Sequence, residues 1–589
     1  DAPLLSHLYP LTSSIQAIAM FKVSSLQAFV CITILSSTLA RTLGCRCFPG
    51  DKCWPSAAEW AAFNETIHGR LIATVPIASI CHHDSFAPYD AEKCEQLQNV
   101  WLLPETHYSS SSSIMAQFFA NMSCDPFTQP SAQCVLGTYV QYAVNATGPD
   151  DFQKAMAFAT DKNIRFVIRS TGHDYFGKST GAGALALWTH NMKDMEILDY
   201  HSRNYTGKAL KTGAGVQVID ALVAAHAQGL VVAGGQCQSL AVAGGYTQGG
   251  GHSLMASVIG LSADQVLEWE VVTATGECLV ATPLNNSDLY WALSGGGGGA
   301  YAAVLSVTVK AYPDVEVSAA NLTFTIAEGV SSESFFAVIQ TWLQSLPAIV
   351  DAGAVALWTL ADGFFSLSPV FGPNLTLSKL QDLLSPTLAA LNQNGIPYSS
   401  YSAGYSTFLD AYNAMNPPQP VTDGNMGAYL LPRDLVTSEA NASALTNVLE
   451  TLVTEGVVTG GVSLNVARGQ DITHPVANSV NPVWRTTIHY LAFGLPYNRT
   501  SLSANVDDWN LITNNYGPRL DALVPGGMSS YLNEANPFDP DWKRVFYGDT
   551  YNPLLEIKDK YDPNSIFYGL TAVGSDRWEV QNDGRLCKV

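Results

Sequence analysis

The alternation of apolar and polar residues divides this 589-residue chain into regions. Between about 135 and 312, short apolar runs rich in β-branched residues alternate with segments of helical period, and glycine stands at nearly every turn. The pattern predicts strands over "RFVIRS" and "ALALWT" and helices near 150–162 and over "VQVIDALVAAHAQ". It is typical of a domain that mixes helices with strands.

From 313 to about 545, longer helical patterns such as "SSESFFAVIQTWLQSL" alternate with strands such as "WRTTIHYLAF". Apolar and polar residues alternate along these strands, which predicts an antiparallel sheet covered by helices on one face. The other face is then free to line a pocket. We therefore expect an α+β fold in which a second domain, residues 313–545, binds the substrate.

The N-terminal region differs in composition from the rest of the chain. Met20 begins a stretch with Lys22, an apolar run and a small-residue end at Ala40, which is typical of a secretory signal peptide. Residues 1–40 are thus expected to be an upstream segment and a signal, and residues 41–130 a Cys-rich extension. Seven cysteines between Cys45 and Cys134, together with Cys587, are enough for four disulfides, whose pairing the spacing does not assign.

The charge of the chain and its glycosylation motifs indicate which kinds of partner to expect. The chain has 29 Lys and Arg against 50 Asp and Glu, which makes nucleic acid an unfavourable partner. After the signal, no run is long and apolar enough to span a bilayer. N-glycans on a secreted, extracellular protein are expected at nine Asn-x-Ser/Thr sites: Asn64, Asn121, Asn145, Asn204, Asn285, Asn321, Asn374, Asn441 and Asn498.

Three glycine-rich stretches carry the candidate chemistry: "RSTGHDYFGKSTGAG", "GGQCQSLAVAGGYTQGGGHS" and "LYWALSGGGGGAYAAVLSVTVKAYP". Glycine lets backbone approach phosphates or a flat ring closely, so three such turns favour one extended cofactor. The Gly213-Ala214-Gly215 turn lacks the third glycine of a nicotinamide dinucleotide loop. No metal site is expected, because the Cys-His-His-Asp run at 81–84 has no second ligand cluster.

With the C-terminal "FYGDTYNPLLEIKDKYDPNSIFYGLTAVGSD", these stretches resemble vanillyl-alcohol-oxidase-like flavoproteins of the berberine-bridge-enzyme-like branch, most closely fungal secreted isoamyl-alcohol-oxidase-like proteins. The resemblance covers most of residues 45–589. It implies a two-part, PCMH-type FAD-binding domain, formed by 131–312 and a C-terminal segment, 546–589, that returns to it.

The resemblance also implies the cofactor and its attachment. The residues matching His173 and Cys237 bond covalently to the flavin in such proteins, so we expect bicovalent FAD. Further FAD-binding residues are expected at Arg169, Ser170, Thr171, Gly172, Asp174, Gly244, Gly245, Gly249, Gly250, Gly251 and His252.

Related enzymes often carry a Tyr-x-Asn-Tyr stretch whose last tyrosine is the base. Here the stretch is "YLNE", so Tyr531 is retained and Glu534 replaces the base. Glu534 is expected to act as the base, and the alternatives are an acceptor that orients Tyr531 or a surface glutamate at the end of a strand. The expected reaction moves a hydride from an alcohol carbon to flavin N5, after which O2 is reduced to H2O2.

The sequence is also compatible with other electron acceptors, other substrates and a non-catalytic role. Leu240 stands where many oxidases of the family have valine, which favours a dehydrogenase with another electron acceptor. The same fold also serves oxidation of a secondary metabolite or a sugar hemiacetal. A catalytically silent flavin-binding glycoprotein would keep the FAD site without a working base.

Overall fold

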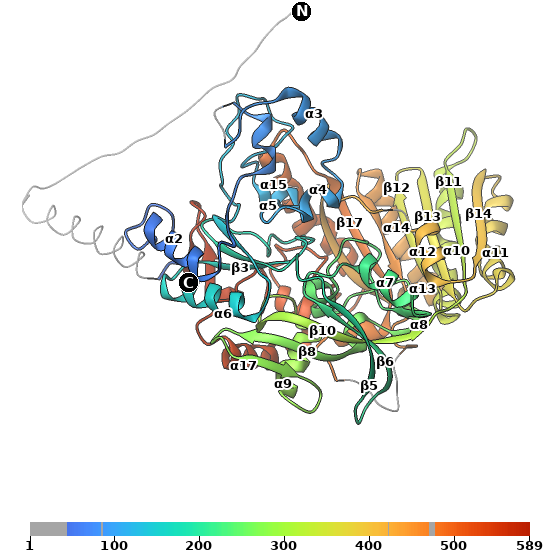
Figure 1. Cartoon of the computed structure of the whole chain (residues 1–589). Helices are drawn as coiled ribbons and strands as arrows, with labels where there is room; N and C mark the ends of the chain where they lie inside the picture. Colours follow the sequence, from blue (N-terminus) through green and yellow to red (C-terminus); the bar gives the residue numbers. More distant parts are fainter. Residues whose placement is uncertain (1–43, 84–85, 417, 422, 470–476) are drawn as a thin grey trace, which may run out of the picture. The chain divides into compact units, whose positions relative to one another are not determined.

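Three large β-sheets organise the chain in a computed structural model (Figure 1). The structure describes residues 44–83, 86–416, 418–421, 423–469 and 477–589. The predicted signal segment, 1–40, lies outside the described residues.

The first sheet has four strands in the order β1-β2-β4-β3. They are β1 (Leu71–Ala73), β2 (Tyr142–Asn145), β4 (Leu185–Trp188) and β3 (Phe166–Arg169). The last three run parallel, and β4 is buried along its whole length, as expected for a strand covered on both faces. Helix α6 (Pro149–Asp161) buries Phe152 and Met156 against this sheet.

The second sheet is antiparallel in the order β5-β6-β10-β8-β9, and a further strand, β7, also pairs with β10. Its strands are β5 (Met195–His201), β6 (Thr206–Gly213), β7 (Leu230–Val232), β8 (Val266–Thr273), β9 (Cys278–Ala281) and β10 (Ala302–Pro313). Helix α7 (Val218–His226) packs on β7. Together with the first sheet, this confirms the predicted mixture of helices and strands.

The third sheet has seven antiparallel strands in the order β14-β11-β13-β12-β16-β17-β15. They are β11 (Val317–Thr325), β12 (Val355–Ala361), β13 (Phe364–Pro373), β14 (Tyr398–Tyr405), β15 (Gly424–Pro432), β16 (Val458–Ser463) and β17 (Thr487–Pro496). One face is covered by α10 (Ser332–Asp351), α11 (Leu377–Gln393) and α14 (Glu439–Thr454).

The opposite face of this third sheet is also partly buried. Along β15, Leu430 belongs to the core shared with the second sheet, whereas its neighbour Leu431 belongs to the core under the helices. Val355 and Ala356 divide in the same way on β12. The period-two pattern therefore places every second side chain toward the remainder of the molecule, where a site can form.

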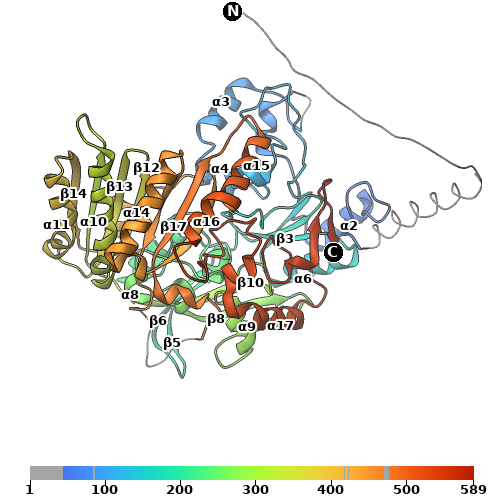
Figure 2. The same ribbon diagram turned by 180° about the vertical axis from the view of Figure 1, so that it is seen from behind.

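The predicted Cys-rich extension consists of two separate parts. Helix α2 (Ala57–Thr66) packs Trp60 and Phe63 into the core of the first sheet, and β1 joins that sheet. Residues 86–138, which we call the N-terminal lobe, carry α3 (Ala91–Asn99), α4 (Pro104–Tyr108) and α5 (Gln117–Ala120). This lobe lies beside α15 (Leu502–Leu511) in both views (Figures 1 and 2).

The eight cysteines expected in disulfides are all disulfide-bonded. The structure pairs Cys47 with Cys53, Cys81 with Cys94 and Cys124 with Cys134, and it also places Cys45 and Cys587 in disulfide bonds. Cys237 and Cys278 are free thiols.

The C-terminal residues contact the first two sheets. Helix α17 (Tyr551–Tyr561) lies beside α9 (Ser287–Leu293) (Figure 2). The buried Lys558 ammonium donates to the Ala300 carbonyl and pairs with Asp562, each over less than 2.8 Å. Phe567 forms an isolated bridge with Phe166 of β3. Across the described residues, no helix is long and apolar enough to cross a membrane.

Candidate active site

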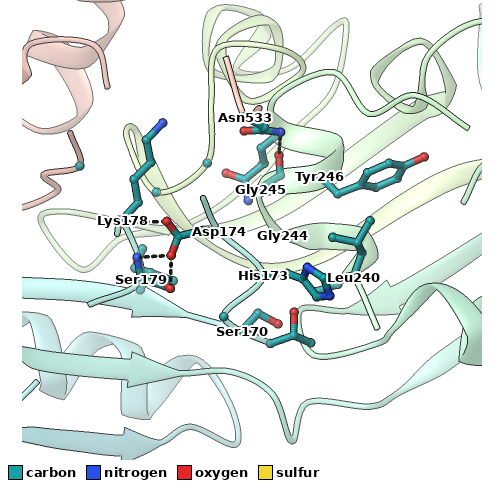
Figure 3. A pocket seen from close by; sticks show the side chains of 18 of the residues that line it. Ser170, His173, Asp174, Lys178, Ser179, Leu240, Gly244, Gly245, Tyr246 and Asn533 are labelled. Carbon is teal, nitrogen blue, oxygen red and sulfur yellow. Dashed lines mark hydrogen bonds between the residues drawn. The ribbon is translucent and has the colours of Figure 1, made fainter. Parts of the chain in front are cut away.

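Residues from several parts of the chain line one cavity, and ten of them are labelled in Figure 3. Most of the lining comes from β3 and the loop after it, the segment 237–248 after β7, the glycine turn at 298–299, residues 531–534 and residues 567–569, and Thr189, Ala214 and Val304 complete it. Ten residues predicted from the sequence line it: Ser170, Thr171, Gly172, His173, Asp174, Cys237, Gly244, Gly245, Tyr531 and Glu534. The structure thus brings together both candidate flavin attachment residues and both candidate catalytic residues.

The loop after β3 is held in shape by Asp174. Its carboxylate accepts hydrogen bonds from the backbone amides of Phe176, Lys178 and Ser179, at 2.8–3.0 Å, and from the Ser179 hydroxyl (Figure 3). These bonds occupy the carboxylate. Asp174 therefore fixes the turn that surrounds a ligand.

Arg169 does not line the cavity, although the sequence predicted it to bind the cofactor. Its side chain is 1% exposed and lies under Gly172, where an added Cβ would come within 2.4 Å of the guanidinium. Gly172 has φ +82°, so both its conformation and its neighbour require glycine. Burial lowers the pKa of Arg169 to about 10, and its Nη2 donates to the His107 carbonyl at 3.1 Å. Arg169 thus supports the loop from beneath.

His173 is a neutral imidazole in this cavity. Burial lowers its pKa to about 4. Its Nε2 lies 2.8 Å from Ser239 Oγ, within hydrogen-bond distance, so Ser239 orients the ring. A neutral ring with one nitrogen so engaged keeps the other nitrogen for bonding to a ligand.

The backbone just before Cys237 is held by α12 (Phe408–Met415), a helix that packs against strands of the third sheet. The Tyr412 hydroxyl contacts the carbonyls of Gly235 and Gln236, each at 2.9 Å, and Asn416 Nδ2 donates to the Gln236 carbonyl at 2.8 Å. Burial raises the pKa of the Cys237 thiol to about 12, so it is protonated before any ligand enters.

Two polar side chains that the sequence analysis missed also line the cavity. Lys178 forms no ion pair among the described residues, and burial lowers its pKa to about 8. Gln248 is 5% exposed, and within the described part of the chain its Oε1 has no hydrogen-bond donor. A ligand with a phosphate anion and a ring N–H satisfies both, and FAD carries both groups. The cavity therefore fits FAD.

Of the glycines in the second stretch, only Gly244 and Gly245 line the cavity. Gly249, Gly250, Gly251 and His252 do not line it. A Cβ on Gly249 would lie 2.3 Å from Asn533 Nδ2, and one on Gly251, at φ +75°, would lie 2.9 Å from the Tyr246 ring. These glycines make room for other parts of the protein.

His252 contacts Glu534 from behind the cavity. Its Nε2 is 3.4 Å from the Glu534 carboxylate, and its ring stacks on Tyr490 with 5.8 Å between centroids. The Tyr490 hydroxyl donates to the Glu534 backbone carbonyl at 3.0 Å. His252 and Tyr490 thus fix Glu534 through its side chain and its main chain.

Tyr531 is a buried phenol in the same group. Burial, followed by the nearby Glu534 charge, raises its pKa well above the usual value, so it stays protonated. Its oxygen accepts a hydrogen bond from Asn533 Nδ2 at 2.8 Å, and the same amide donates to the Gly245 carbonyl at 2.7 Å. Among the "YLNE" side chains, Glu534 is therefore the one able to accept a proton.

Comparisons with known proteins agree with this site. The family model "FAD binding domain" matches residues 140–282, and the model "Berberine and berberine like" matches residues 530–573, which include Tyr531 and Glu534. The FAD-linked oxidoreductase sor8 of Hypocrea jecorina (strain QM6a) is 46% identical over 545 residues, which cover 92% of this chain and 93% of that protein.

Solved structures show the same fold. The VAO-type flavoprotein MtVAO615 from Myceliophthora thermophila C1 superimposes with a TM-score of 0.87 at 40% identity, covering 92% of this chain and 100% of that one. The glucooligosaccharide oxidase from Acremonium strictum, described with 6-S-cysteinyl, 8α-N1-histidyl FAD, is 15% identical with a TM-score of 0.59 over 74% of this chain and 92% of its own, and shows the fold alone. The chain belongs to the vanillyl-alcohol-oxidase and berberine-bridge-like family of FAD-linked oxidoreductases, with its PCMH-type FAD-binding fold.

Proposed function

We propose that the protein oxidises the CH–OH group of an alcohol and that Glu534 accepts the hydroxyl proton. The observation that carries this proposal is the Glu534 carboxylate, which lines the FAD cavity together with His173 and Cys237. Bound FAD supplies the two-electron acceptor for the hydride of the carbon. Because an alcohol hydroxyl holds its proton firmly, the protein must supply a base beside that carbon.

The surrounding residues hold that base in place. The Glu534 amide donates to the Tyr531 carbonyl at 2.9 Å, which closes a tight turn, and His252 faces the carboxylate. The Tyr531 hydroxyl accepts from Asn533, so its own proton is available to the substrate oxygen. In this arrangement Tyr531 binds and orients the alcohol, and Glu534 takes the proton.

We also propose that FAD is bonded to both His173 and Cys237. The neutral imidazole of His173 and the free thiol of Cys237 line the same cavity, which supports a double attachment. Two bonds would hold the ring firmly beside a wide substrate pocket, and electron withdrawal through them would raise the flavin potential.

Acid denaturation of the secreted chain tests the attachment. We expect flavin to stay on the His173 and Cys237 peptides, as read by absorbance and peptide mass. Cys237→Ser should leave flavin on the His173 peptide alone. Cys278→Ser is the matched control, because Cys278 is also a free thiol but is exposed on β9 and does not line the cavity. Flavin released into the supernatant by wild type would contradict the double attachment.

The same preparation tests which substrate is oxidised and which electron acceptor reoxidises the flavin. A panel of primary and secondary alcohols, sugars and aromatic metabolites is screened for flavin bleaching without oxygen and for H2O2 release with it. Leu240 lines the cavity, so bleaching with slow reoxidation by O2 and fast reoxidation by a quinone or dye would identify a dehydrogenase. Flavin that no compound bleaches would favour the silent binding protein.

We further propose that the mature protein is secreted and carries N-glycans. Five of the nine sequon asparagines are exposed: Asn121, Asn204, Asn285, Asn374 and Asn441. Asn321, in contrast, lies within β11 between two paired strands, with its amide oxygen buried, and is not expected to be modified. Peptide mass before and after enzymatic deglycosylation of the secreted chain tests this assignment.

A further inference from the structure

A second, smaller cavity lies between the N-terminal lobe and the third sheet. Residues that line it include Gln117, Phe118 and Phe119 of α5, Trp509 of α15, and Tyr175 and Ala535. Tyr175 lines the FAD cavity as well, and Ala535 follows Glu534 in the chain. The second cavity therefore adjoins the proposed reaction site.

Two buried N–H groups of this cavity have no acceptor. Gln117 is 3% exposed and Trp509 is 6% exposed. Gln117 Nε2 and Trp509 Nε1 make no hydrogen bond to any part of the chain that the structure describes. Each such donor costs free energy, and because both side chains line this cavity, a ligand atom that enters it meets two donors for which the described residues supply no acceptor. A carbonyl oxygen, with two lone pairs, can accept from both.

The remaining walls are largely apolar. The Phe118 and Trp509 rings meet edge to face at 5.8 Å between centroids. The Phe119 ring lies against Gly177 of the cofactor loop, where an added Cβ would be 2.8 Å from it. No charged side chain of the described residues lines this cavity. A sugar ring carries several hydroxyls, most of which would find no partner on such walls.

The volume limits what the cavity can hold. It measures about 20 Å³, which is room for one small group rather than a whole molecule. Helix α5 is fixed in place, because Thr138 Oγ1 donates to the Phe119 carbonyl at 2.8 Å and the Cys124–Cys134 disulfide follows directly. The backbone that carries Gln117 is therefore fixed before a ligand arrives, which favours affinity.

We propose that this cavity is a subsite for a carbonyl oxygen of the substrate, remote from the carbon that is oxidised. The substrate class is then a largely apolar molecule that carries a ketone, ester or lactone carbonyl besides its alcohol, and not an oligosaccharide. The inference rests on the proposed function, since it names the substrate of that site.

A pair of isosteric probes tests the subsite in the oxidised holoenzyme. Acetophenone carries the carbonyl, and α-methylstyrene replaces C=O by C=CH2 with nearly the same shape. We expect acetophenone to bind about tenfold more tightly, as measured by ligand-observed NMR. Gln117→Met should remove most of this preference without changing the affinity for α-methylstyrene. Trp509→Phe should reduce the preference while an aromatic ring remains at position 509. Gln96→Met, on the exposed face of α3 in the same lobe, is the matched control and should keep it.

Equal affinities of the two probes for wild type would overturn the subsite and assign the donors to a trapped water. A preference that survives both variants, or lactose binding more tightly than acetophenone, would overturn it too. Flavin content reports the folding of each variant, and Trp509→Phe decides the question if Gln117→Met fails to fold. Because binding needs no turnover, a protein that discriminates the probes but oxidises no alcohol would contradict the proposed reaction and leave the subsite standing.

Discussion

The two glycine stretches that contain histidine have similar sequences and different roles in the structure. The loop at 170–179 turns its backbone and side chains into the FAD cavity. The stretch at 244–252 lines that cavity with Gly244, Gly245, Tyr246 and Gln248, whereas Gly249 and Gly251 make room for the side chains of Asn533 and Tyr246. Glycine indicates that something approaches the backbone closely. At Gly172 of the first loop that partner is the Arg169 guanidinium beneath it, and at Gly249 and Gly251 of the second stretch it is the side chains of Asn533 and Tyr246.

Residues 249–252 of the second stretch pack against residues 531–534. A Cβ on Gly249 would meet Asn533, a Cβ on Gly250 would lie 3.7 Å from the Tyr531 ring, and His252 faces Glu534. Residues 249–252 therefore form a base for the segment 531–534. Under the proposed function, the first loop holds the cofactor and residues 249–252 position Glu534, the proposed proton acceptor, and the following predictions separate these roles.

The largest effect is expected for Glu534→Gln. Without a carboxylate to take the alcohol proton, the rate of flavin reduction should fall by roughly 10²–10⁴-fold. Flavin content should be unchanged, because His173 and Cys237 are untouched. Stopped-flow absorbance without oxygen measures the rate. Glu92→Gln, on the first turn of α3, is the control. An unchanged rate in Glu534→Gln would remove this residue from the mechanism.

Two alanine substitutions should give opposite results. A Cβ on Gly245 meets no protein atom within 4 Å, so Gly245→Ala should keep its melting temperature and weaken FAD binding by about 1–3 kcal/mol, because the methyl enters the ligand space. Gly251→Ala forces an unfavourable φ against the Tyr246 ring and should lower the free energy of unfolding by about 1–3 kcal/mol. Thermal melts measure the stability of both variants, and titration of FAD into the same variants made in the His173→Ala, Cys237→Ser background measures the affinity. Similar losses of stability and of FAD binding in Gly245→Ala and Gly251→Ala would contradict the different roles assigned to these two glycines.

A smaller effect is expected for Lys178→Met. Its ammonium is the free cation of the first loop, so its loss should weaken FAD binding about tenfold. Reversible binding is measured by titrating FAD into the His173→Ala, Cys237→Ser double variant, which cannot bond the flavin. Lys52→Met, exposed near the N-terminus of the described chain, is the control.

The same titration should depend on pH. Burial lowers the pKa of Lys178 to about 8 in the flavin-free protein, so the ammonium is charged below pH 8 and loses its proton above it. FAD affinity should therefore fall as pH rises through about 8, because the anionic diphosphate prefers the charged form. Lys178→Met should flatten this part of the profile. A profile that rises with pH, or that persists in Lys178→Met, would contradict the assignment.

The order of strands and helices was predictable because their periodicity is local. The pattern of "FVIRS" and "LALW" indicates buried strands whatever surrounds them, and the structure confirms both. The mixture of helices and strands and the antiparallel third sheet follow from the same signal. The clustering of Ser170 to Asp174 with Cys237 came from a family resemblance, since nothing in the spacing alone joins a loop after β3 to one after β7.

Other parts of the site depend on contacts that no local pattern contains. Arg169 lies under its loop because Gly172 leaves space there, which the motif does not indicate. Lys178 could have been singled out from the sequence, because it is the one lysine or arginine among the turn residues from 170 to 179. A lysine in a loop is ordinarily solvated, however, so its burial was not expected. Gln248 and Gln117 are neutral amides whose significance appears only when burial leaves a polar atom without a partner.

The hydrogen bonds from α12 to the backbone before Cys237 have a consequence for engineering. A chimaera that takes residues 313–545 from a relative with other side chains in place of Tyr412 and Asn416 would lose the hydrogen bonds to the carbonyls of Gly235 and Gln236. Exchanging the proposed substrate-binding domain would then also remove the hydrogen bonds that hold the backbone before Cys237, a proposed attachment residue. Grafts that retain these two side chains should mature with their cofactor, and the substrate range of this enzyme is best altered around them.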